Sequence, residues 1–255
     1  MNTKTFVKTK NVKKFVSLMD RLKKLPPNIP KLALVYGSHG LGKTKTLIWW
    51  ATKNDAIYVR ANNDMTQNGL LKEIMLDLNI RPFHSMQDNL DEILKYLRQD
   101  PKILIVDEVD YLFNKNAIEI LRDIQDNTGT PIVLSGMGVV DTKIARYKHF
   151  DDRLYKKLKF EHYNEDDIRE ILNEMTDLSF TDDAIRYLAS RTNQFRKIVQ
   201  TLDELEKIAE TNNLTEITED ILKGKINERI LTRLSIAKAA PVKNLTECRI
   251  TGGNS

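Results

Sequence analysis

The most informative stretch of this sequence is Gly37-Ser38-His39-Gly40-Leu41-Gly42-Lys43-Thr44. It fits the pattern G-x-x-x-x-G-K-[ST], and it stands directly after an apolar run and before a helical segment, which is the context that a phosphate-binding loop requires. The glycines allow the backbone to curl, so that its N–H groups and the start of the next helix converge on a phosphate. We therefore predict that these residues bind a nucleoside triphosphate.

Two side chains of this stretch have distinct predicted tasks. Lys43 is expected to reach the β- and γ-phosphates, and the hydroxyl of Thr44 is expected to bind Mg²⁺. Lys45, the next residue, is included in the predicted binding segment. The expected cofactors are accordingly ATP and Mg²⁺.

Apolar runs of strand length alternate with helical patterns on both sides of this loop. The predicted strands are Leu32–Tyr36, Ala56–Arg60, Ile103–Val106, Ile132–Ser135 and, near the end of the series, Tyr155–Phe160. Such alternation is typical of a parallel sheet with helices on both faces. The predicted fold class is α/β, with a parallel sheet flanked by helices and followed by a small helical lid.

The sequence divides into four predicted segments. Residues 1–27 form a basic N-terminal helix that must end before Pro26-Pro27, because proline removes a backbone donor and restricts φ. Residues 28–162 form the α/β nucleotide-binding domain, residues 163–235 the helical lid domain, and residues 236–255 a flexible C-terminal tail. In the lid, Asn164 and Thr181 each precede acidic residues and are predicted helix N-caps.

The third predicted strand ends in two acids, Asp107 and Glu108. Asp107 is expected to hold Mg²⁺ through water, and Glu108 to orient or polarise the water that attacks the γ-phosphate, which implies hydrolysis. The alternative for Glu108 is a carboxylate that merely begins a helix. Ser135, at the end of the neighbouring strand, is expected to position the same water; its alternative is the start of a turn.

Arginine is expected to supply the remaining chemistry, because a guanidinium neutralises charge on a transferred phosphoryl group. Arg153 and Arg146 are the candidates for a residue delivered from a neighbouring subunit, with Arg153 favoured, and a surface role facing solvent or DNA is the alternative for both. Arg196, at the start of a lid helix, is expected to reach the γ-phosphate of its own subunit; its alternative is a surface arginine. A site completed in this way requires a homo-oligomer.

Charge and composition restrict the partners. The formal net charge is +4, yet the first 31 residues hold nine Lys or Arg and one acid. A second basic stretch covers residues 143–159, and either stretch could face phosphates. No run approaches the roughly 20 apolar residues that cross a bilayer, so we expect a cytoplasmic protein without a membrane partner. The one cysteine, Cys248, excludes an intramolecular disulfide.

Three longer stretches carry a family resemblance. Residues 107–112 (Asp-Glu-Val-Asp-Tyr-Leu), residues 119–126 (Glu-Ile-Leu-Arg-Asp-Ile-Gln-Asp) and residues 130–137 (Thr-Pro-Ile-Val-Leu-Ser-Gly-Met) resemble the AAA+ transposition regulators of the MuB and TnsC type. The resemblance covers roughly residues 10–230. It implies an ATPase that assembles as filaments or rings on duplex DNA, marks a target site, and recruits and stimulates a transposase.

If DNA is the partner, sequence-independent contacts to phosphates are sufficient, and binding should weaken with salt. The candidate contacts are Arg60, Asn62 and Thr66 after the second strand and Lys115 after the third, with solvated loop residues as the alternative. The rival functions are a helicase loader of the IstB/DnaC type or an origin-recognition-like replication ATPase. A nucleotide-controlled signalling switch, which needs no DNA, is the third class.

Overall fold

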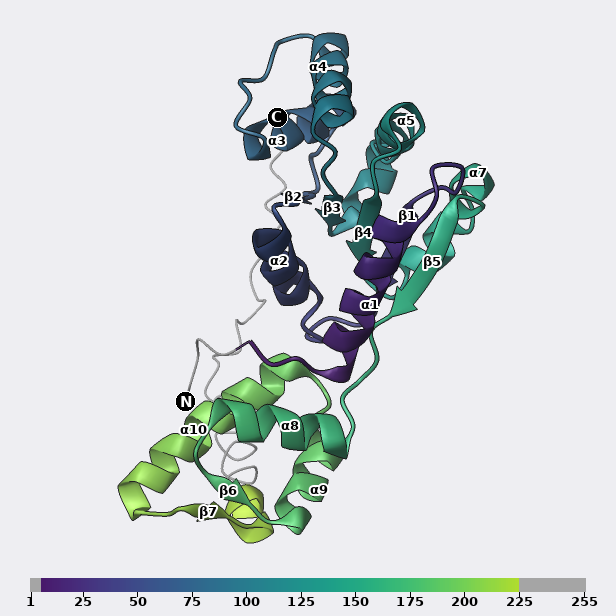
Figure 1. Ribbon diagram of the computed structural model, residues 1–255. Coiled ribbons are helices and arrows are strands. Elements are labelled where there is room, and N and C mark those ends of the chain that lie inside the picture. Colours follow the sequence, from purple (N-terminus) through teal and green to yellow (C-terminus); the bar gives the residue numbers. More distant parts are fainter. Residues whose placement is uncertain (1–5, 225–255) are drawn as a thin grey trace, which may run out of the picture.

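The computed structural model describes residues 6–224, except for the side chains of Asn114, Lys115 and His149. A sheet-containing region is followed by a mainly helical region, which lies at the lower end of the molecule in Figure 1. The predicted tail, residues 236–255, and Cys248 within it lie outside the described residues, as does the end of the predicted lid.

Five parallel strands form the sheet, in the order β2-β3-β4-β1-β5. Their bounds are β1 (Leu32–Tyr36), β2 (Ile57–Arg60), β3 (Leu104–Asp107), β4 (Ile132–Gly136) and β5 (Leu154–Lys159). All five predicted strands are therefore present, within about one residue at each end. From β1 the chain crosses to β2 at one edge of the sheet and returns through β3 and β4 until β4 lies beside β1. It then continues to β5 on the other side of β1. The strand order therefore reverses beside β1, and α/β sheets bind ligands at such a point.

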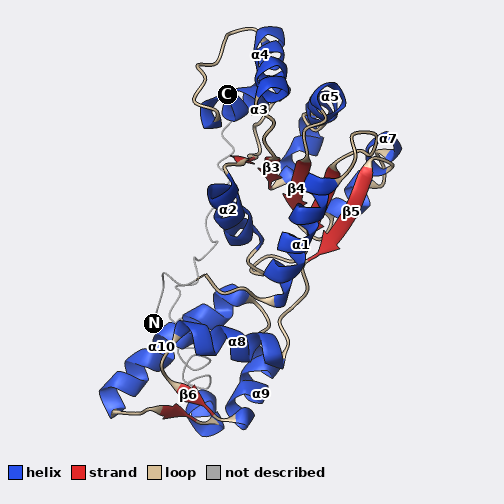
Figure 2. Ribbon diagram, viewed as in Figure 1, coloured by secondary structure: helices blue, strands red, loops and turns tan. Residues whose placement is uncertain are grey.

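Helices cover both faces of the sheet, as Figure 2 shows. Side chains of β1 alternate between two cores: Ala33 and Val35 pack with α1, α2 and the lid, whereas Leu32 and Leu34 pack with the helices of the other face. This alternation follows from the pleat of a strand. The helices of the region are α1 (Lys10–Lys24), α2 (Lys43–Asn54), α3 (Gln67–Asp77), α4 (Met86–Gln99), the 3₁₀ helix η1 (Val109–Lys115), α5 (Glu119–Thr128), α6 (Val140–Ile144) and α7 (Lys148–Asp151).

The second region contains α8 (Glu165–Met175), α9 (Asp182–Arg191) and α10 (Phe195–Asn212). Both predicted N-caps are confirmed: Asn164 and Asp167 form a capping box, and the Thr181 side chain accepts a hydrogen bond from the Ala184 N–H. Two short strands, β6 (Ser179–Phe180) after α8 and β7 (Glu216–Ile217) after α10, pair in parallel. The helical pattern did not predict them, because two residues are too few to show a period.

Within residues 6–224, no helix combines the length and the apolar character that a membrane crossing needs.

Candidate nucleotide-binding site

The predicted phosphate-binding loop joins the end of β1 to the start of α2. At Gly37, an added Cβ would lie 2.6 Å from the carbonyl oxygen of Phe160, so no larger residue fits there. Gly42, the residue before α2, has φ of 84°, a conformation that side chains disfavour. The loop is thus curled tightly against the end of β5, with the first N–H groups of α2 at its open side.

Lys43 lies across the mouth of this loop. Its ammonium donates to the carbonyl oxygens of Gly37, at 2.7 Å, and Ser38, at 2.9 Å. Burial lowers the pKa of Lys43, while Asp107, Asp110 and Glu108 oppose that effect. A half-buried cation held by two neutral carbonyls is a fitting partner for phosphate oxygens, because an anion would compensate its charge better than those carbonyls do.

Asp107 ends β3 beside the first turn of α2. Its carboxylate Oδ2 accepts hydrogen bonds from the Thr44 hydroxyl, at 2.7 Å, and from the Tyr58 hydroxyl, at 3.2 Å. Burial and the adjacent Asp107 raise the pKa of Tyr58, which keeps that hydroxyl a donor. The side chains of Thr44 and Asp107, 63 residues apart in sequence, are therefore in direct contact.

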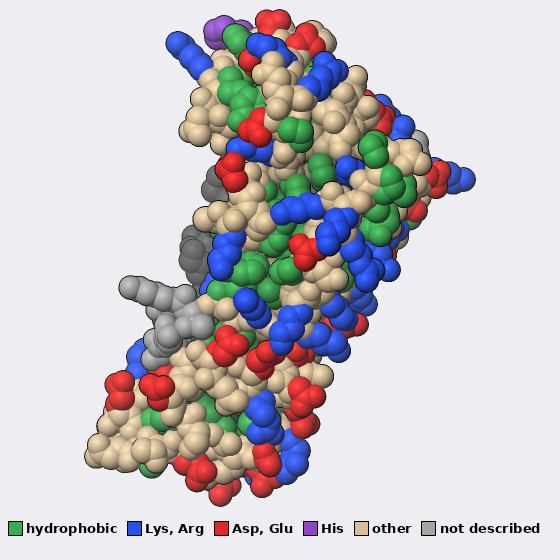
Figure 3. All heavy atoms as spheres, in the orientation of Figure 1, with side chains coloured by type: hydrophobic (Ala, Val, Ile, Leu, Met, Phe, Trp, Pro, Cys, Tyr) green, Lys and Arg blue, Asp and Glu red, His purple; other side chains and the backbone are tan. Residues whose placement is uncertain are grey.

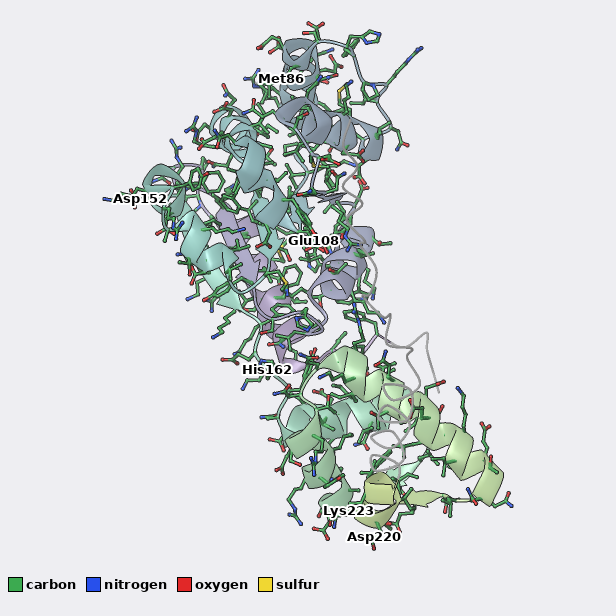
Figure 4. All side chains as sticks on the ribbon, turned by 180° about the vertical axis from the view of Figure 1, so that it is seen from behind. Met86, Glu108, Asp152, His162, Asp220 and Lys223 are labelled. Carbon is green, nitrogen blue, oxygen red and sulfur yellow. The ribbon has the colours of Figure 1, made fainter. Side chains whose placement is uncertain are left out.

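Glu108 follows Asp107 and is half-exposed. The residue has a left-handed conformation, with φ of 57°, and its carboxylate Oε1 is 2.6 Å from a guanidinium nitrogen of Arg60. Figure 4 labels Glu108 near the middle of the molecule, at the end of β3, and His162 where the chain passes into the lid. The acid predicted to activate water is thus held by the cation at the end of the neighbouring strand.

These residues surround a cavity of about 650 Å³, within the size range of ligand pockets. The phosphate loop and the ends of β2 and β3 contribute His39, Gly40, Leu41, Gly42, Lys43, Thr44, Lys45, Arg60, Asp107 and Glu108. Helix α10 of the lid adds Phe195, Arg196, Val199 and Gln200. Arg196 therefore faces the same cavity as Lys43, although the two residues belong to different regions of the chain.

A smaller cavity of about 280 Å³ adjoins the first and shares Gly42, Lys45 and Phe195 with it. Its other walls are mainly apolar, and they include Trp49, whose ring stacks on Phe6 with centroids 4.2 Å apart. The other residues that line it are Val7, Thr9, Val12, Thr46, Ile48, Tyr163 and Met175.

Ser135 is completely buried and does not line the main cavity. The register of β3 and β4 pairs Ile105 with Val133 and Val106 with Leu134, so Ser135 is the next neighbour of Asp107. Its hydroxyl has no hydrogen-bond partner in the structure. A buried hydroxyl without a partner is uncommon.

Neither arginine predicted to act on a neighbouring subunit lines the cavity of its own chain. Arg153 forms an ion pair with Asp126, with the nearest atoms 3.1 Å apart, and Arg146 is exposed. Both positions are accessible from outside the molecule, as a residue that acts on a neighbour requires.

The predicted DNA-contacting residues have local partners. Arg60 pairs with Glu108, the Asn62 side chain accepts a hydrogen bond from the Asp64 N–H, and the Thr66 side chain accepts one from the Gly69 N–H as the N-cap of α3. The side chain of Lys115 lies outside the described residues. In this arrangement these side chains serve the site and its loop.

Sequence patterns did not identify three further residues of the site. Tyr58 donates to Asp107, and Asp110 accepts a hydrogen bond from the Met137 N–H at 2.8 Å, which ties β4 to the turn after β3. Tyr163 donates from its hydroxyl to the carbonyl oxygen of Leu41 at 2.8 Å, and burial raises its pKa to about 12. Each contact joins distant parts of the chain, so no local signal marks it.

The residues fit a magnesium nucleotide. The described side chains of residues 6–224, which leave out His149, include no cluster of three or more His, Cys, Asp or Glu that could hold a metal alone. Mg²⁺ does not need such a cluster, since it usually takes one or two protein ligands together with phosphate oxygens and water. The Thr44 hydroxyl and the Asp107 carboxylate, already in contact, would hold it.

Strand order, phosphate loop and lid together define the class: the chain has the fold of an AAA+ P-loop ATPase. Comparison with known proteins agrees, since residues 30–144 match the family described as AAA domain. The structure is similar to the Aeropyrum pernix ORC2 protein solved as ADPNP and ADP complexes, with a TM-score of 0.64 at 16% identity over 85% of this chain and 67% of that one.

Two curated relatives are also similar. The Mu-like prophage FluMu DNA transposition protein B of Haemophilus influenzae is 31% identical over 116 residues, which are 44% of this chain and 40% of that protein. A potential ATP-binding protein of Staphylococcus aureus is 22% identical over 86% of this chain and 94% of its own length. The transposition protein is thus matched over less than half of its length.

Proposed function

We propose that this protein is an ATP hydrolase that oligomerises on duplex DNA without sequence preference and regulates DNA transposition. The observation that carries the ATPase part is the contact between Thr44 and Asp107 beside the half-buried ammonium of Lys43. The observation that supports transposition is the similarity to the transposition protein of Haemophilus influenzae. A transposase or related recombination protein is the corresponding partner.

The two cavities accommodate different parts of ATP. The loop N–H groups and Lys43 would bind the phosphates, with Mg²⁺ held by Thr44 and Asp107. The adjoining apolar cavity beside Trp49 and Phe6 suits the flat, apolar faces of a nucleobase. The bound metal would neutralise charge on the phosphates, and side chains of the protein would position the attacking water and compensate the remaining charge.

Hydrolysis needs a positioned water and compensation of the developing charge. Glu108 would accept the proton of that water once its pairing with Arg60 is released. The hydroxyl of Ser135, which has no partner, would help to position the same water from β4. Arg196 would approach the γ-phosphate from the lid. Arg153, or else Arg146, would complete the site from a neighbouring subunit.

A second candidate, an origin-recognition-like replication ATPase or a helicase loader, is favoured by the similarity to the ORC2 structure. That likeness concerns the fold, because the identity is 16%. The two candidates share the nucleotide chemistry and differ in the protein partner, so assembly on DNA is the first property to measure.

The test is electron microscopy in negative stain of the protein with random-sequence duplex DNA and ATP, ADP or no nucleotide. The matched controls are Lys43→Ala, which removes the phosphate-binding ammonium, and Lys95→Ala on the exposed face of α4. Filaments or rings that require ATP, persist in Lys95→Ala and disappear in Lys43→Ala are expected. Absence of any ATP-dependent assembly on DNA would contradict the proposal and favour a loader or a nucleotide switch.

A further inference from the structure

Two basic segments that are far apart in the sequence lie side by side. Helix α1 packs against β5, the edge strand of the sheet, and Figure 1 shows them adjacent. In Figure 3 the Lys and Arg side chains gather over this part of the surface. The N-terminal charge and part of the second basic stretch therefore form one surface.

Four of the six cations of α1 form a line along the helix. Lys10, Lys14, Arg21 and Lys24 fall on one stripe of the helix, together with Ser17, because at 100° per residue they lie within about 80° of one another. At 1.5 Å per residue the stripe is about 21 Å long. The acid Asp20 lies to one side of it.

Strand β5 extends the line into a ridge. Lys156 and Lys159 are exposed on this edge strand; the register pairs Lys156 with Ala33, on the face that α1 covers, and Lys159 with Tyr36, on the other face, near Glu161. The helix stripe and the strand come together at Glu161, whose carboxylate is 2.8 Å from Lys14. Lys14 lowers the pKa of Glu161 most, and Lys10 and Lys159 lower it further. Among residues 6–224, the remaining cations Lys10, Arg21, Lys24, Lys156 and Lys159 have no ion-pair partner, so their charge is available to an outside anion.

We propose that this basic ridge, defined as Lys10, Lys14, Arg21, Lys24, Lys156 and Lys159, binds the sugar-phosphate backbone of duplex DNA. The inference rests on the proposed function and adds a contact surface different from the loops around Arg60. A line of cations about 21 Å long matches about six base pairs at 3.4 Å per step. Contacts of this kind read no sequence and fix only the position of the duplex.

The structure favours DNA over a lipid surface as the occupant. An interfacial helix must present an apolar face to the acyl chains. In α1 that face is already used: Phe15, Met19 and Leu22 are completely buried against the sheet and the lid. Only the charged side remains accessible, which suits a polyanion and not a bilayer.

The test compares two triple variants of the full chain. Lys10→Gln/Arg21→Gln/Lys24→Gln neutralises the ridge with a residue of similar helix propensity. Arg81→Gln/Lys95→Gln/Lys207→Gln removes the same charge from the loop after α3, from α4 and from α10. Affinity for a short random-sequence duplex is measured by fluorescence anisotropy with ATP over a range of salt concentrations, and nucleotide affinity and thermal stability are measured in parallel.

Each phosphate contact contributes about 0.9 to the slope of log affinity against log salt, so the ridge variant should lose roughly 2 to 3 from that slope while the control keeps it. Lys10→Arg/Lys24→Arg should bind as the wild type does. Should the triple variant fail to fold, Lys156→Gln/Lys159→Gln tests the same ridge from β5 with an expected loss of roughly 2.

The outcomes separate the two proposals. Wild-type protein that does not bind DNA overturns the proposed function and the ridge with it. Wild-type binding with equal slopes in the ridge and control variants overturns the ridge alone. Ridge-dependent binding to phosphatidylglycerol vesicles, with DNA affinity unchanged in the ridge variant, also overturns it and identifies a lipid headgroup as the anion.

Discussion

A guanidinium nitrogen of Arg60, at the end of β2, lies 2.6 Å from the carboxylate of Glu108, after β3. We propose that Glu108 accepts a proton from water, and the guanidinium now occupies one of the carboxylate oxygens that would have to face that water. We therefore expect the pair to hold the site in a state of low hydrolytic capacity. Both partners are partly exposed, so the pairing is weak.

Arg60→Ala should raise ATP hydrolysis in the absence of DNA. An exposed ion pair is worth about 1 kcal/mol or less, so its removal should increase the fraction of free Glu108, and with it the basal rate, by up to about fivefold. Release of inorganic phosphate, measured with and without DNA, tests this. Arg60→Lys, which keeps the charge, should remain near the wild-type rate. A rate in Arg60→Ala well below that of the wild type would instead make Arg60 a contributor to hydrolysis.

Glu108→Gln should bind ATP normally and hydrolyse it slowly. The amide keeps the size of the side chain and loses the base, and general-base catalysis contributes about 10²- to 10⁴-fold. Assemblies on DNA should therefore persist for longer than those of the wild type, which can be followed by light scattering after ATP is depleted. Turnover at the wild-type rate would remove Glu108 from its proposed role.

Arg153→Ala should bind ATP but not hydrolyse it, because the guanidinium is proposed to act on the neighbouring subunit. Loss of the exposed pair with Asp126 should change stability by at most about 1 kcal/mol. The decisive measurement is the hydrolysis rate of a mixture of two variants. In an equimolar mixture of Arg153→Ala and Glu108→Gln, about a quarter of the sites combine an intact Glu108 with an intact Arg153 from the next subunit.

Phosphate release by that mixture should therefore recover to about a quarter of the wild-type rate per site, although each protein alone hydrolyses ATP slowly or not at all. The same mixture made with Arg146→Ala in place of Arg153→Ala identifies which arginine acts. No recovery in either mixture would place both arginines outside the chemistry.

The sheet and the phosphate loop could be predicted because their signals are local. An apolar run, a glycine-rich turn and a helical pattern follow one another within about twenty residues around Lys43, and backbone geometry requires each of them there. The bonds that organise the site join distant residues instead. Arg60 and Glu108 are 48 residues apart, and Tyr163 and Leu41 are 122 residues apart.

Such pairs depend on strand order and on how the lid packs, and the spacing of residues within one segment predicts neither property. The same reason explains the loop residues predicted to contact DNA. Arg60 and Thr66 have the polarity that a phosphate contact needs, but the fold uses one to hold Glu108 and the other to cap α3. In the sequence the basic ridge is two separate charge clusters, and only the packing of α1 beside β5 joins them.

Tyr163→Phe tests the connection between the lid and the phosphate loop. The Tyr163 hydroxyl donates to the carbonyl oxygen of Leu41, and its loss leaves that buried acceptor without this partner. Leaving such an acceptor unsatisfied costs about 1 to 3 kcal/mol. Unfolding in urea should show a loss in this range, and ATP affinity should fall several-fold because the loop is less well held. Tyr155→Phe, at an exposed position on β5, is the matched control and should change neither quantity.

The same hydroxyl predicts a dependence on pH. Burial raises the pKa of Tyr163 from its ordinary 10.0 to about 12. A raised folded-state pKa means that its contribution to stability is fully present below pH 10 and is lost as the pH rises to about 12, because the unfolded chain releases the proton first. Wild-type protein should therefore lose more stability over this interval than Tyr163→Phe does, with the Tyr155→Phe protein following the wild type. Parallel stability curves for the wild type and Tyr163→Phe would show that the hydroxyl is not buried as it is in the structure.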